Sequence, residues 1–453
     1  MRTALIAALA ASAAIVHYAN GSPAGWTAYL FLAAVPLLSG IYASGLRDCN
    51  YWLSLTGLVE AWFLLDYCFY GTAVALLQRS KTPLPSTLED AYSSGYAIGI
   101  IALAAFAAGA YFGFAAPRPP DFTPQVSSII SPGAWRIFFV FTAAGVASIV
   151  ILLLDDESRR QLFYEHVGLS PREGMGRYTA LLFMLPTTAV TLWFLSRPKH
   201  NYPAALTLAG LSLVAAIHLG YGRRLMWAGT MLLIFHFLKV RRIFTLRTTH
   251  LVMAIPLVLA VSGLLETTKN RGWSTAVDPV HMPALADGQK IFDMVDNSVG
   301  RFDTTAALIV NRQWMPYYMG ETFMLAPLQV LPVSAGMERS RGVREELGEM
   351  IYGAFGKNLV SQETSLVGEL YANFGSAGVL AGFLLVGFAA ARLDARYHHS
   401  REPLVAAGYA LCLFRCIHQL ATASTSWFPL TFLAFLPWMC AVAVTRMNPR
   451  ARL

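Results

Sequence analysis

The sequence predicts an all-α protein that crosses a membrane about a dozen times and carries one large extracytoplasmic loop. Three observations predict this fold class. Apolar residues make up 56% of the 453 residues and charged residues only 13%, whereas a soluble domain carries about 25% charged residues. The apolar residues form stretches of about 20, the length of a membrane helix. Basic residues fall in every second connection between these stretches.

Each apolar stretch is interpreted as one span, since a chain so poor in charge does not cover a water-facing surface. The predicted spans are 3–19, 26–44, 52–77, 95–116, 134–154, 177–196, 203–220, 224–240, 250–266, 374–392, 402–421 and 425–445. The first of them resembles a signal peptide, but an uncleaved helix suits the topology better. The chain thereby divides into an N-terminal bundle of about nine helices (1–265), an extracytoplasmic cap (266–373) and a C-terminal bundle of about three helices (374–453).

The positions of the basic residues orient the chain in the membrane. Cytoplasmic loops carry an excess of Lys and Arg. The connections after spans two, four, six, eight and ten and the C-terminal tail hold Arg47, Arg118, Arg136, Arg197, Lys199, Arg241, Arg242, Arg392, Arg396, Arg446 and Arg450. This alternation predicts cytoplasmic termini and places the cap outside. It also accounts for the net charge of +8 without nucleic acid as a partner.

The cap is too rich in aromatic residues for a disordered loop. Apolar residues at helical spacing predict a helix over 287–312. Pro327 and Pro332 favour an irregular segment over 321–335, lying against the membrane surface. A short charged helix is expected over 341–352.

Several kinds of site are absent from the sequence. It contains no P-loop, no GxGxxG after a strand, no HExxH, no serine elbow and no DxD pair for a metal-bound nucleotide sugar. The five cysteines lie in or beside apolar stretches. Cys412 and Cys416, with His418 nearby, have the spacing of a metal-binding pair. Their apolar surroundings favour cysteines that are simply packed in the interior. We therefore expect neither a metal nor a cofactor.

Arginines on the outer side are the first candidate site residues. Arg223 and Arg224 lie in a short outer turn between spans seven and eight. Guanidinium groups bind phosphate oxygens through paired hydrogen bonds, so the turn is a candidate anion clamp. Headgroup anchoring or an ion pair with acidic residues after span five is the alternative. Arg301 and Asp303 lie in the cap, two residues apart and so on different faces of a helix, and a structural ion pair would also explain them.

A polar stripe precedes span ten. It consists of Gln362, Ser365, Glu369 and Asn373 at helical spacing. The stripe is expected to face an outer cavity, while Gly378 and Gly382 pack against a neighbouring helix. Glu369 is a candidate to accept a proton or to bind a sugar hydroxyl. A capping and packing role is equally consistent with the pattern.

Ionisable residues inside predicted spans are costly and often functional. Arg415 and His418 lie on adjacent turns of span eleven. His418 is a candidate general base or a hydrogen-bonded packing residue, and Arg415 needs an anionic partner. Glu60 and Asp66 lie in span three. Asp66 either relays protons or pairs with Arg415 or Arg224.

Three short patches carry a resemblance to a known family. Gly368-Glu-Leu-Tyr-Ala-Asn-Phe-Gly375, followed by an apolar span and Arg392-Leu-Asp394, resembles the bacterial O-antigen polymerase family of oligosaccharide repeat-unit polymerases. The turn Gly222-Arg-Arg-Leu-Met-Trp227 and the patch Arg301-Phe-Asp303 look like the family's other shared patches. The order of the three patches and the large loop before the last spans also agree. Residue matches cover about a tenth of the chain.

The resemblance implies a bacterial inner-membrane glycosyltransferase of the GT-C-like, lipid-donor kind, with its active site on the periplasmic side. Such an enzyme moves a glycan from an undecaprenyl diphosphate carrier onto the next lipid-linked repeat unit. The implied partners are lipid-linked oligosaccharide donor and acceptor, membrane lipid, a chain-length regulator and a flippase. The leaving diphosphate explains outer arginines physically, because fixed cations stabilise its developing charge.

The mechanistic hypothesis assigns ten residues. The catalytic residues are Arg224, Arg301, Glu369 and His418, and the substrate-binding residues are Arg223, Asp303, Tyr371, Asn373, Arg415 and Asp66. Arginines hold the diphosphate, and Glu369 or His418 activates the acceptor hydroxyl. An O-antigen ligase, a secondary transporter or flippase of envelope precursors, and a structural scaffold are the alternative functions.

Overall fold

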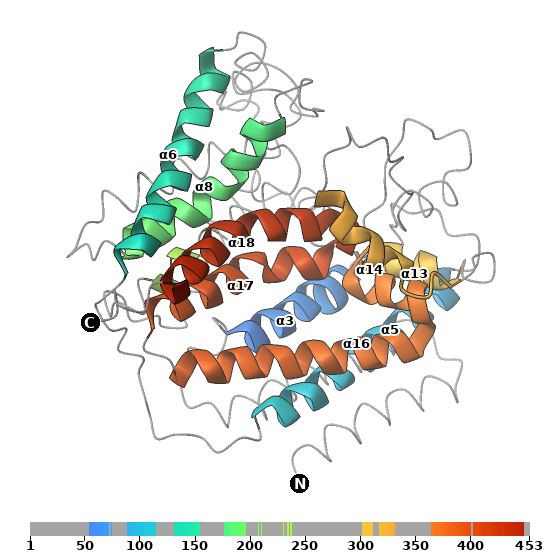
Figure 1. Ribbon diagram of the computed structural model, residues 1–453. Coiled ribbons are helices and arrows are strands. Elements are labelled where there is room, and N and C mark those ends of the chain that lie inside the picture. Colours follow the sequence, from blue (N-terminus) through green and yellow to red (C-terminus); the bar gives the residue numbers. More distant parts are fainter. Residues whose placement is uncertain are drawn as a thin grey trace, which may run out of the picture. The chain divides into compact units, whose positions relative to one another are not determined.

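The computed structural model describes residues 54–71, 74, 88–114, 131–154, 176–195, 207, 210, 230, 233, 234, 236, 237, 301–310, 317–330, 364–399 and 402–447. Within these ranges every regular element is helical (Figure 1). The elements are α3 (Leu55–Phe63), the π-helix η2 (Leu64–Gly71), α5 (Leu88–Phe114), α6 (Pro132–Leu154), α8 (Gly176–Leu195), α13 (Phe302–Val310), α14 (Glu321–Leu325), the 3₁₀ helix η4 (Ala326–Val330), α16 (Leu366–His399), α17 (Pro403–Ala421) and α18 (Ser424–Met447).

Five helices in the described ranges are long and apolar enough to cross a membrane. They are α5, α6, α16, α17 and α18. The structure therefore agrees with the predicted class, a helical membrane protein. Spans 3–19, 26–44 and 250–266 lie outside the described residues, and spans 203–220 and 224–240 are described at only a few positions. The count of twelve spans stays a prediction.

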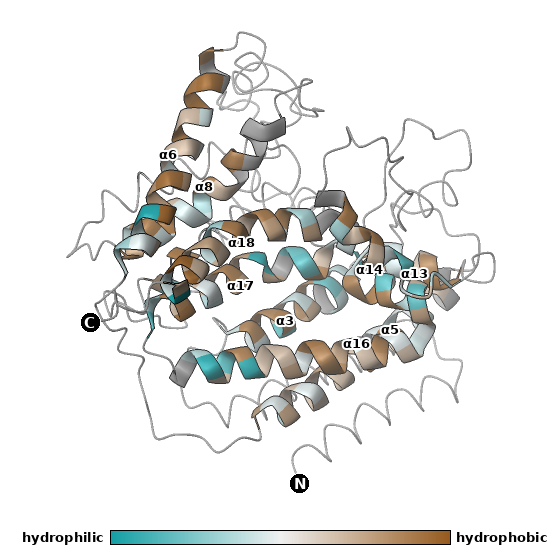
Figure 2. Ribbon diagram, in the orientation of Figure 1, coloured by the Kyte–Doolittle hydropathy of each residue, from teal (hydrophilic) through white to brown (hydrophobic). Residues whose placement is uncertain are grey.

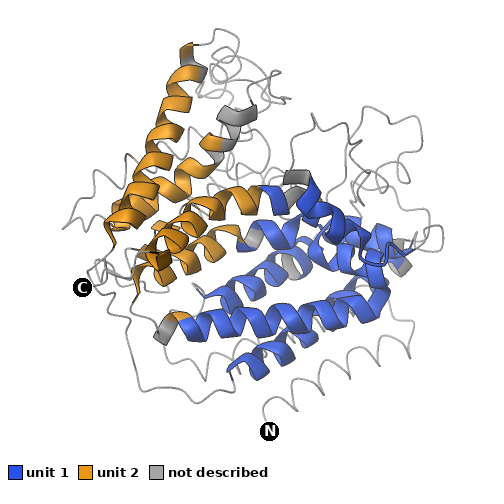
Figure 3. Ribbon diagram, in the orientation of Figure 1, with its two compact units in different colours: residues 1–120, 295–396, 416–429 blue, residues 121–294, 397–415, 430–453 orange. Residues whose placement is uncertain are grey.

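The chain forms two compact units, coloured separately in Figure 3. Unit 1 comprises residues 1–120, 295–396 and 416–429, and unit 2 comprises residues 121–294, 397–415 and 430–453. The division into two bundles and a cap concerns position relative to a membrane, so it also stays a prediction.

Unit 1 is packed around a buried phenylalanine at the start of α13. The Phe302 ring lies 5.5 Å from Tyr67, 5.8 Å from Tyr92 and 4.5 Å from Tyr96, measured between ring centroids. Glycines at positions 71 and 95 leave room for this ring. Phe302 therefore packs α13 against η2 and α5.

Helices α5 and α16 of unit 1 pack backbone against backbone. Gly109 lies against the main chain of Leu384, and Gly387 lies against the main chain of Phe106. Small residues allow this approach, which adds van der Waals contact where lipid supplies no hydrophobic drive between helices.

Helix α16 is broken at Gly375, whose backbone angles are φ 64° and ψ −156°. Residues 366–374 consequently turn back, and Leu370 packs over Gly378 and Gly382. The two glycines were predicted to pack against a neighbouring helix, and the helical segment that they contact is the one before the break. They accommodate the preceding segment of their own helix, since a straight helix would put residues 370 and 378 about 12 Å apart.

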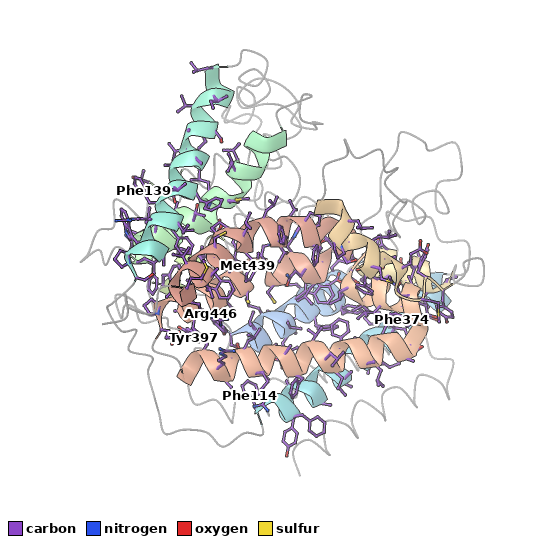
Figure 4. All side chains as sticks on the ribbon, in the orientation of Figure 1. Phe114, Phe139, Phe374, Tyr397, Met439 and Arg446 are labelled. Carbon is purple, nitrogen blue, oxygen red and sulfur yellow. The ribbon has the colours of Figure 1, made fainter. Side chains whose placement is uncertain are left out.

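In unit 2, α6 packs along α8, with Gly145 against Leu185. The rest of α6 exposes large apolar side chains, including Phe139 and Val140. Figure 2 shows α6 as apolar along most of its length, and Figure 4 labels Phe139 on it. Such a surface is suited to lipid.

The described parts of the predicted cap are helical except at residues 301, 317–320, 364 and 365. Residues 302–310 form α13, as predicted for part of 287–312. The irregular segment predicted for 321–335 was wrong at 321–330, where α14 continues directly into η4. Pro327 is the second residue of η4, just after the change from α-helix to 3₁₀ helix. The charged helix predicted at 341–352 lies outside the described residues.

Candidate functional site

Polar side chains of unit 1 converge on the short connection between α17 and α18. This connection runs from Ala421 to Ser424 and is buried. Two of its backbone groups are bound by side chains distant in sequence, from Arg301 and Glu369. We call these residues, their bonded neighbours and the buried His418 one turn before the connection the connection cluster: Asp66, Arg301, Thr322, Glu369, Asn373, His418 and Ser424.

Glu369 is fully buried and accepts three hydrogen bonds. Its Oε1 accepts from the Thr322 hydroxyl (2.9 Å) and the Ser424 hydroxyl (2.5 Å), and its Oε2 accepts from the Ser424 backbone N–H (2.7 Å). Ser424 is the first residue of α18. The carboxylate thus satisfies an otherwise unpaired N–H at a helix N-terminus, where the helix dipole favours negative charge.

Asn373 joins the same group to residues 317–320. Its amide nitrogen donates to the Thr322 hydroxyl and to the Glu369 carbonyl, both at 2.8 Å. Its oxygen accepts from the Gly320 N–H at 2.9 Å. The N–H groups of Tyr318 and Met319 also donate to the carbonyls of Ala372 and Asn373. Tyr318 and Met319 therefore satisfy backbone carbonyls that the break at Gly375 would leave unpaired.

Arg301 and Asp66 bind opposite kinds of helix end. The Arg301 Nε donates to the Ala421 carbonyl at the C-terminus of α17 (3.0 Å), and the guanidinium is half-buried. The Asp66 Oδ1 accepts from the N–H groups of Arg301 (2.6 Å) and Phe302 (3.0 Å), where α13 begins. Cations at C-termini and anions at N-termini are both stabilised by the helix dipole.

Among the described residues Asp66 binds the start of α13 and not Arg415, and its predicted pairing with Arg224, which lies outside them, stays a prediction. Asp66 is also close enough to Arg301 for an electrostatic interaction. Its second oxygen, Oδ2, is buried without a hydrogen-bond partner.

Asp303 and Ser365 lie beside the cluster. Asp303 is buried and accepts from the Thr304 N–H at 2.8 Å. Ser365 accepts from the Gly368 N–H at 3.2 Å, and its hydroxyl is paired with that of Thr305 at 3.0 Å. Ser365 therefore acts as an N-cap of α16 and ties this helix to α13.

His418 lies one turn before the connection and is buried, and its carbonyl accepts from the Thr422 hydroxyl at 2.7 Å. Tyr371 is half-buried and packs against Leu308 and Ala372. Arg415 belongs to unit 2, where it is buried and donates from Nε to Thr431 at 3.2 Å.

The structure brings Asp66, Arg301, Glu369, Asn373 and His418 to one connection. Arg223 and Arg224, the centre of the predicted diphosphate clamp, lie outside the described residues. The position of the clamp relative to the cluster stays a prediction.

Sequence reasoning missed Thr322, Ser424 and Asp394 as structural partners. Asp394 accepts from the N–H groups of Leu55 (3.0 Å) and Thr56 (3.1 Å) and from the Thr56 hydroxyl (2.7 Å) at the start of α3. A buried acid at the end of an apolar span is a signal that could have found it. Thr322 carries no such signal, because its role depends on a contact made 47 residues away.

The described residues include no group of three His, Cys, Asp or Glu that could hold a metal ion. No family model, curated protein or solved structure matches the chain.

Proposed function

We propose that this protein polymerises undecaprenyl-diphosphate-linked oligosaccharide repeat units into a surface polysaccharide by glycosyl transfer at the periplasmic face of the inner membrane. The observation that supports the proposal is the connection cluster. A half-buried arginine, two carboxylates and an amide are joined there by hydrogen bonds, and a buried histidine lies one turn before the connection. Ionisable groups in an apolar helical protein are costly and mark functional sites by default.

In this proposal the arginines hold the donor diphosphate. Arg301 is held in place by its hydrogen bond to the Ala421 carbonyl. Because the residue is only half-buried, a diphosphate can still reach its guanidinium. Together with Arg223 and Arg224 it stabilises the negative charge that develops on the leaving diphosphate. One such contact contributes about 3–4 kcal/mol of transition-state stabilisation.

The hydrogen bonds of Glu369 favour a positioning role for it over a proton-accepting one. Glu369 is fully buried, and about three of the four lone-pair positions of its carboxylate already accept from Thr322 and Ser424. A general base needs a free lone pair facing the acceptor hydroxyl. We therefore assign activation of the acceptor to His418, and to Glu369 the role of holding the connection that follows this histidine.

The direct test is polymerisation by the purified full-length protein in proteoliposomes supplied with lipid-linked repeat units. The wild-type protein is expected to produce a ladder of products. Arg301→Ala, Arg224→Ala and His418→Ala are expected to abolish the ladder. Glu369→Gln is expected to reduce the ladder only to the extent that the substitution destabilises the protein. Arg136→Ala, on the exposed face of α6, is the matched control and is expected to leave the ladder unchanged.

Thermal unfolding in detergent separates loss of fold from loss of chemistry. If Arg301→Ala and His418→Ala keep both the wild-type midpoint and the wild-type ladder, the proposed roles are wrong. If the ladder disappears only with Glu369→Gln, and the midpoint of thermal unfolding is unchanged, Glu369 and not His418 is the general base.

Cells that lack the protein distinguish the related functions. Single repeat units on the cell surface are expected for a missing polymerase. Accumulated lipid-linked polymer would instead indicate a ligase. Transport of a lipid-linked precursor into proteoliposomes that depends on Asp66 would favour a transporter.

A further inference from the structure

Residues 317–330 of unit 1 carry apolar side chains on their outer side. Tyr317 is 46% exposed, Met319 73%, Met324 76% and Leu328 48%, and the adjoining Phe374 of α16 is 42% exposed. We call these five side chains the outer apolar surface. Figure 4 labels Phe374 at the end of α16 that lies beside α14. The whole segment 317–330 contains one charged residue, Glu321.

Thr322 points inward, whereas the charged Glu321 is exposed. Thr322 is buried, and its hydroxyl is bonded to Glu369 and Asn373. A surface helix in water places apolar residues against the core and polar residues outside, whereas most of the exposed side chains here are apolar. The medium around α14 and η4 is therefore expected to be apolar.

The depth of this surface follows from α16. Residues 376–396, the stretch of this helix from the break to Arg396, span about 30 Å at a rise of about 1.5 Å per residue. The hydrocarbon core of a bilayer is about 30 Å thick. Arg392 and Arg396 are exposed near one end, so Gly375 lies close to the opposite boundary.

The segment is tied to that boundary by backbone hydrogen bonds. Tyr318 and Met319 donate to the carbonyls of Ala372 and Asn373, the residues just before Phe374 and Gly375. Helix α16 also exposes apolar side chains, like the outer apolar surface: Leu380 is 52% and Leu385 65% exposed. Tyrosine at such a boundary is typical of the headgroup region.

We infer that residues 317–330, with Phe374, form an in-plane element inserted into the interfacial layer of the bilayer, in contact with lipid acyl chains. This element covers the connection cluster from the lipid side, since the opposite side of α14 supplies Thr322 to Glu369. The inference depends on the membrane class and on the contacts of α14 and α16, and it holds whether or not the chain is a glycosyltransferase.

The test measures depth residue by residue in the full chain reconstituted into vesicles of bacterial phospholipid. Single cysteines replace Met324, Leu328, Leu385 or Glu402 in a cysteine-free variant, and each carries an environment-sensitive fluorophore. Lipids with a nitroxide near the headgroup or near the chain end quench the fluorophore, and aqueous iodide reports exposure to water. Leu385 is the reference for the bilayer centre and the exposed Glu402 is the reference for water.

Probes at Met324 and Leu328 are expected to emit at shorter wavelength than the Glu402 probe and to resist iodide. The shallow nitroxide should quench them more than the deep one, with the reverse order at Leu385. Iodide quenching equal to that at Glu402 would overturn the inference. Protection from both iodide and lipid nitroxides would also overturn it, because the surface would then be covered by protein.

A second measurement avoids the cysteine-free variant. A benzophenone amino acid replaces Met324 in the chain with its native cysteines, and mass spectrometry identifies the photoadduct. Adducts with phospholipid support insertion, and adducts with peptide alone contradict it.

Discussion

At the scale of residues, three buried acids in unit 1 accept hydrogen bonds from the N-termini of other helices. Asp66 binds the start of α13, Glu369 the start of α18 and Asp394 the start of α3. A carboxylate without partners in an apolar interior costs many kcal/mol. Here each carboxylate accepts hydrogen bonds from N–H groups that have no partner within their own helix. The acids thereby join helices that are distant in sequence.

Replacement of Glu369 by glutamine is expected to destabilise the protein by about 1–3 kcal/mol. Glutamine has one oxygen to accept hydrogen bonds, so its NH₂ group would face a donor of Ser424 or Thr322. Thermal unfolding in detergent measures the change. Glu402→Gln, at an exposed position, is the control and should leave the midpoint unchanged.

Two further acid-to-amide substitutions are expected to differ from each other. Both oxygens of Asp394 accept hydrogen bonds, so Asp394→Asn leaves a donor of Leu55 or Thr56 unpaired whichever way the amide is turned. Asp66 uses only Oδ1, so Asp66→Asn keeps both of its hydrogen bonds and places NH₂ at the position without a partner. The loss of unfolding free energy should be larger for Asp394→Asn. An equal loss for the two variants would contradict this account.

At the scale of elements, the break in α16 organises the connection cluster. Gly375 has φ 64° and ψ −156°, a combination essentially restricted to glycine. The break frees carbonyls that accept from Tyr318 and Met319. It also turns residues 366–374 so that Glu369 and Asn373 both reach Thr322. A straight α16 would present neither contact.

Gly375→Ala is therefore expected to cost about 1–3 kcal/mol of stability from backbone strain alone. The added Cβ would in addition press on the Tyr317 ring and hydroxyl. Gly210→Ala is the matched control, because a Cβ there meets nothing within 4 Å and alanine is the better helix former. Thermal unfolding of both variants checks the expectation, and equal midpoints would count against strain at Gly375.

At the scale of the whole molecule, the alternation of basic connections predicts which segments face the cytoplasm. A green fluorescent protein fused after Leu453 should be fluorescent, and alkaline phosphatase fused there should be inactive. Phosphatase fused within residues 266–300 should be active. The opposite pattern at either site would refute cytoplasmic termini or the external cap, and fusions at each connection would count the spans.

The membrane class and the positions of the long helices could be predicted from the sequence alone. The spans predicted at 134–154 and 402–421 correspond to α6 at Pro132–Leu154 and α17 at Pro403–Ala421. A long apolar stretch has few alternatives, because in lipid the backbone satisfies its polar groups within a helix. The polar stripe before span ten was likewise visible from its spacing, and Glu369 and Asn373 do share one cluster.

The partners of the polar residues were decided only by the tertiary structure. Arg301 binds a carbonyl 120 residues away, and Glu369 binds an N–H 55 residues away. Local periodicity carries no information about such contacts, since it reports which face of a helix is apolar and not what that face meets. The bend at Gly375 was equally hidden, because a glycine in an apolar span is consistent with both close packing and a break.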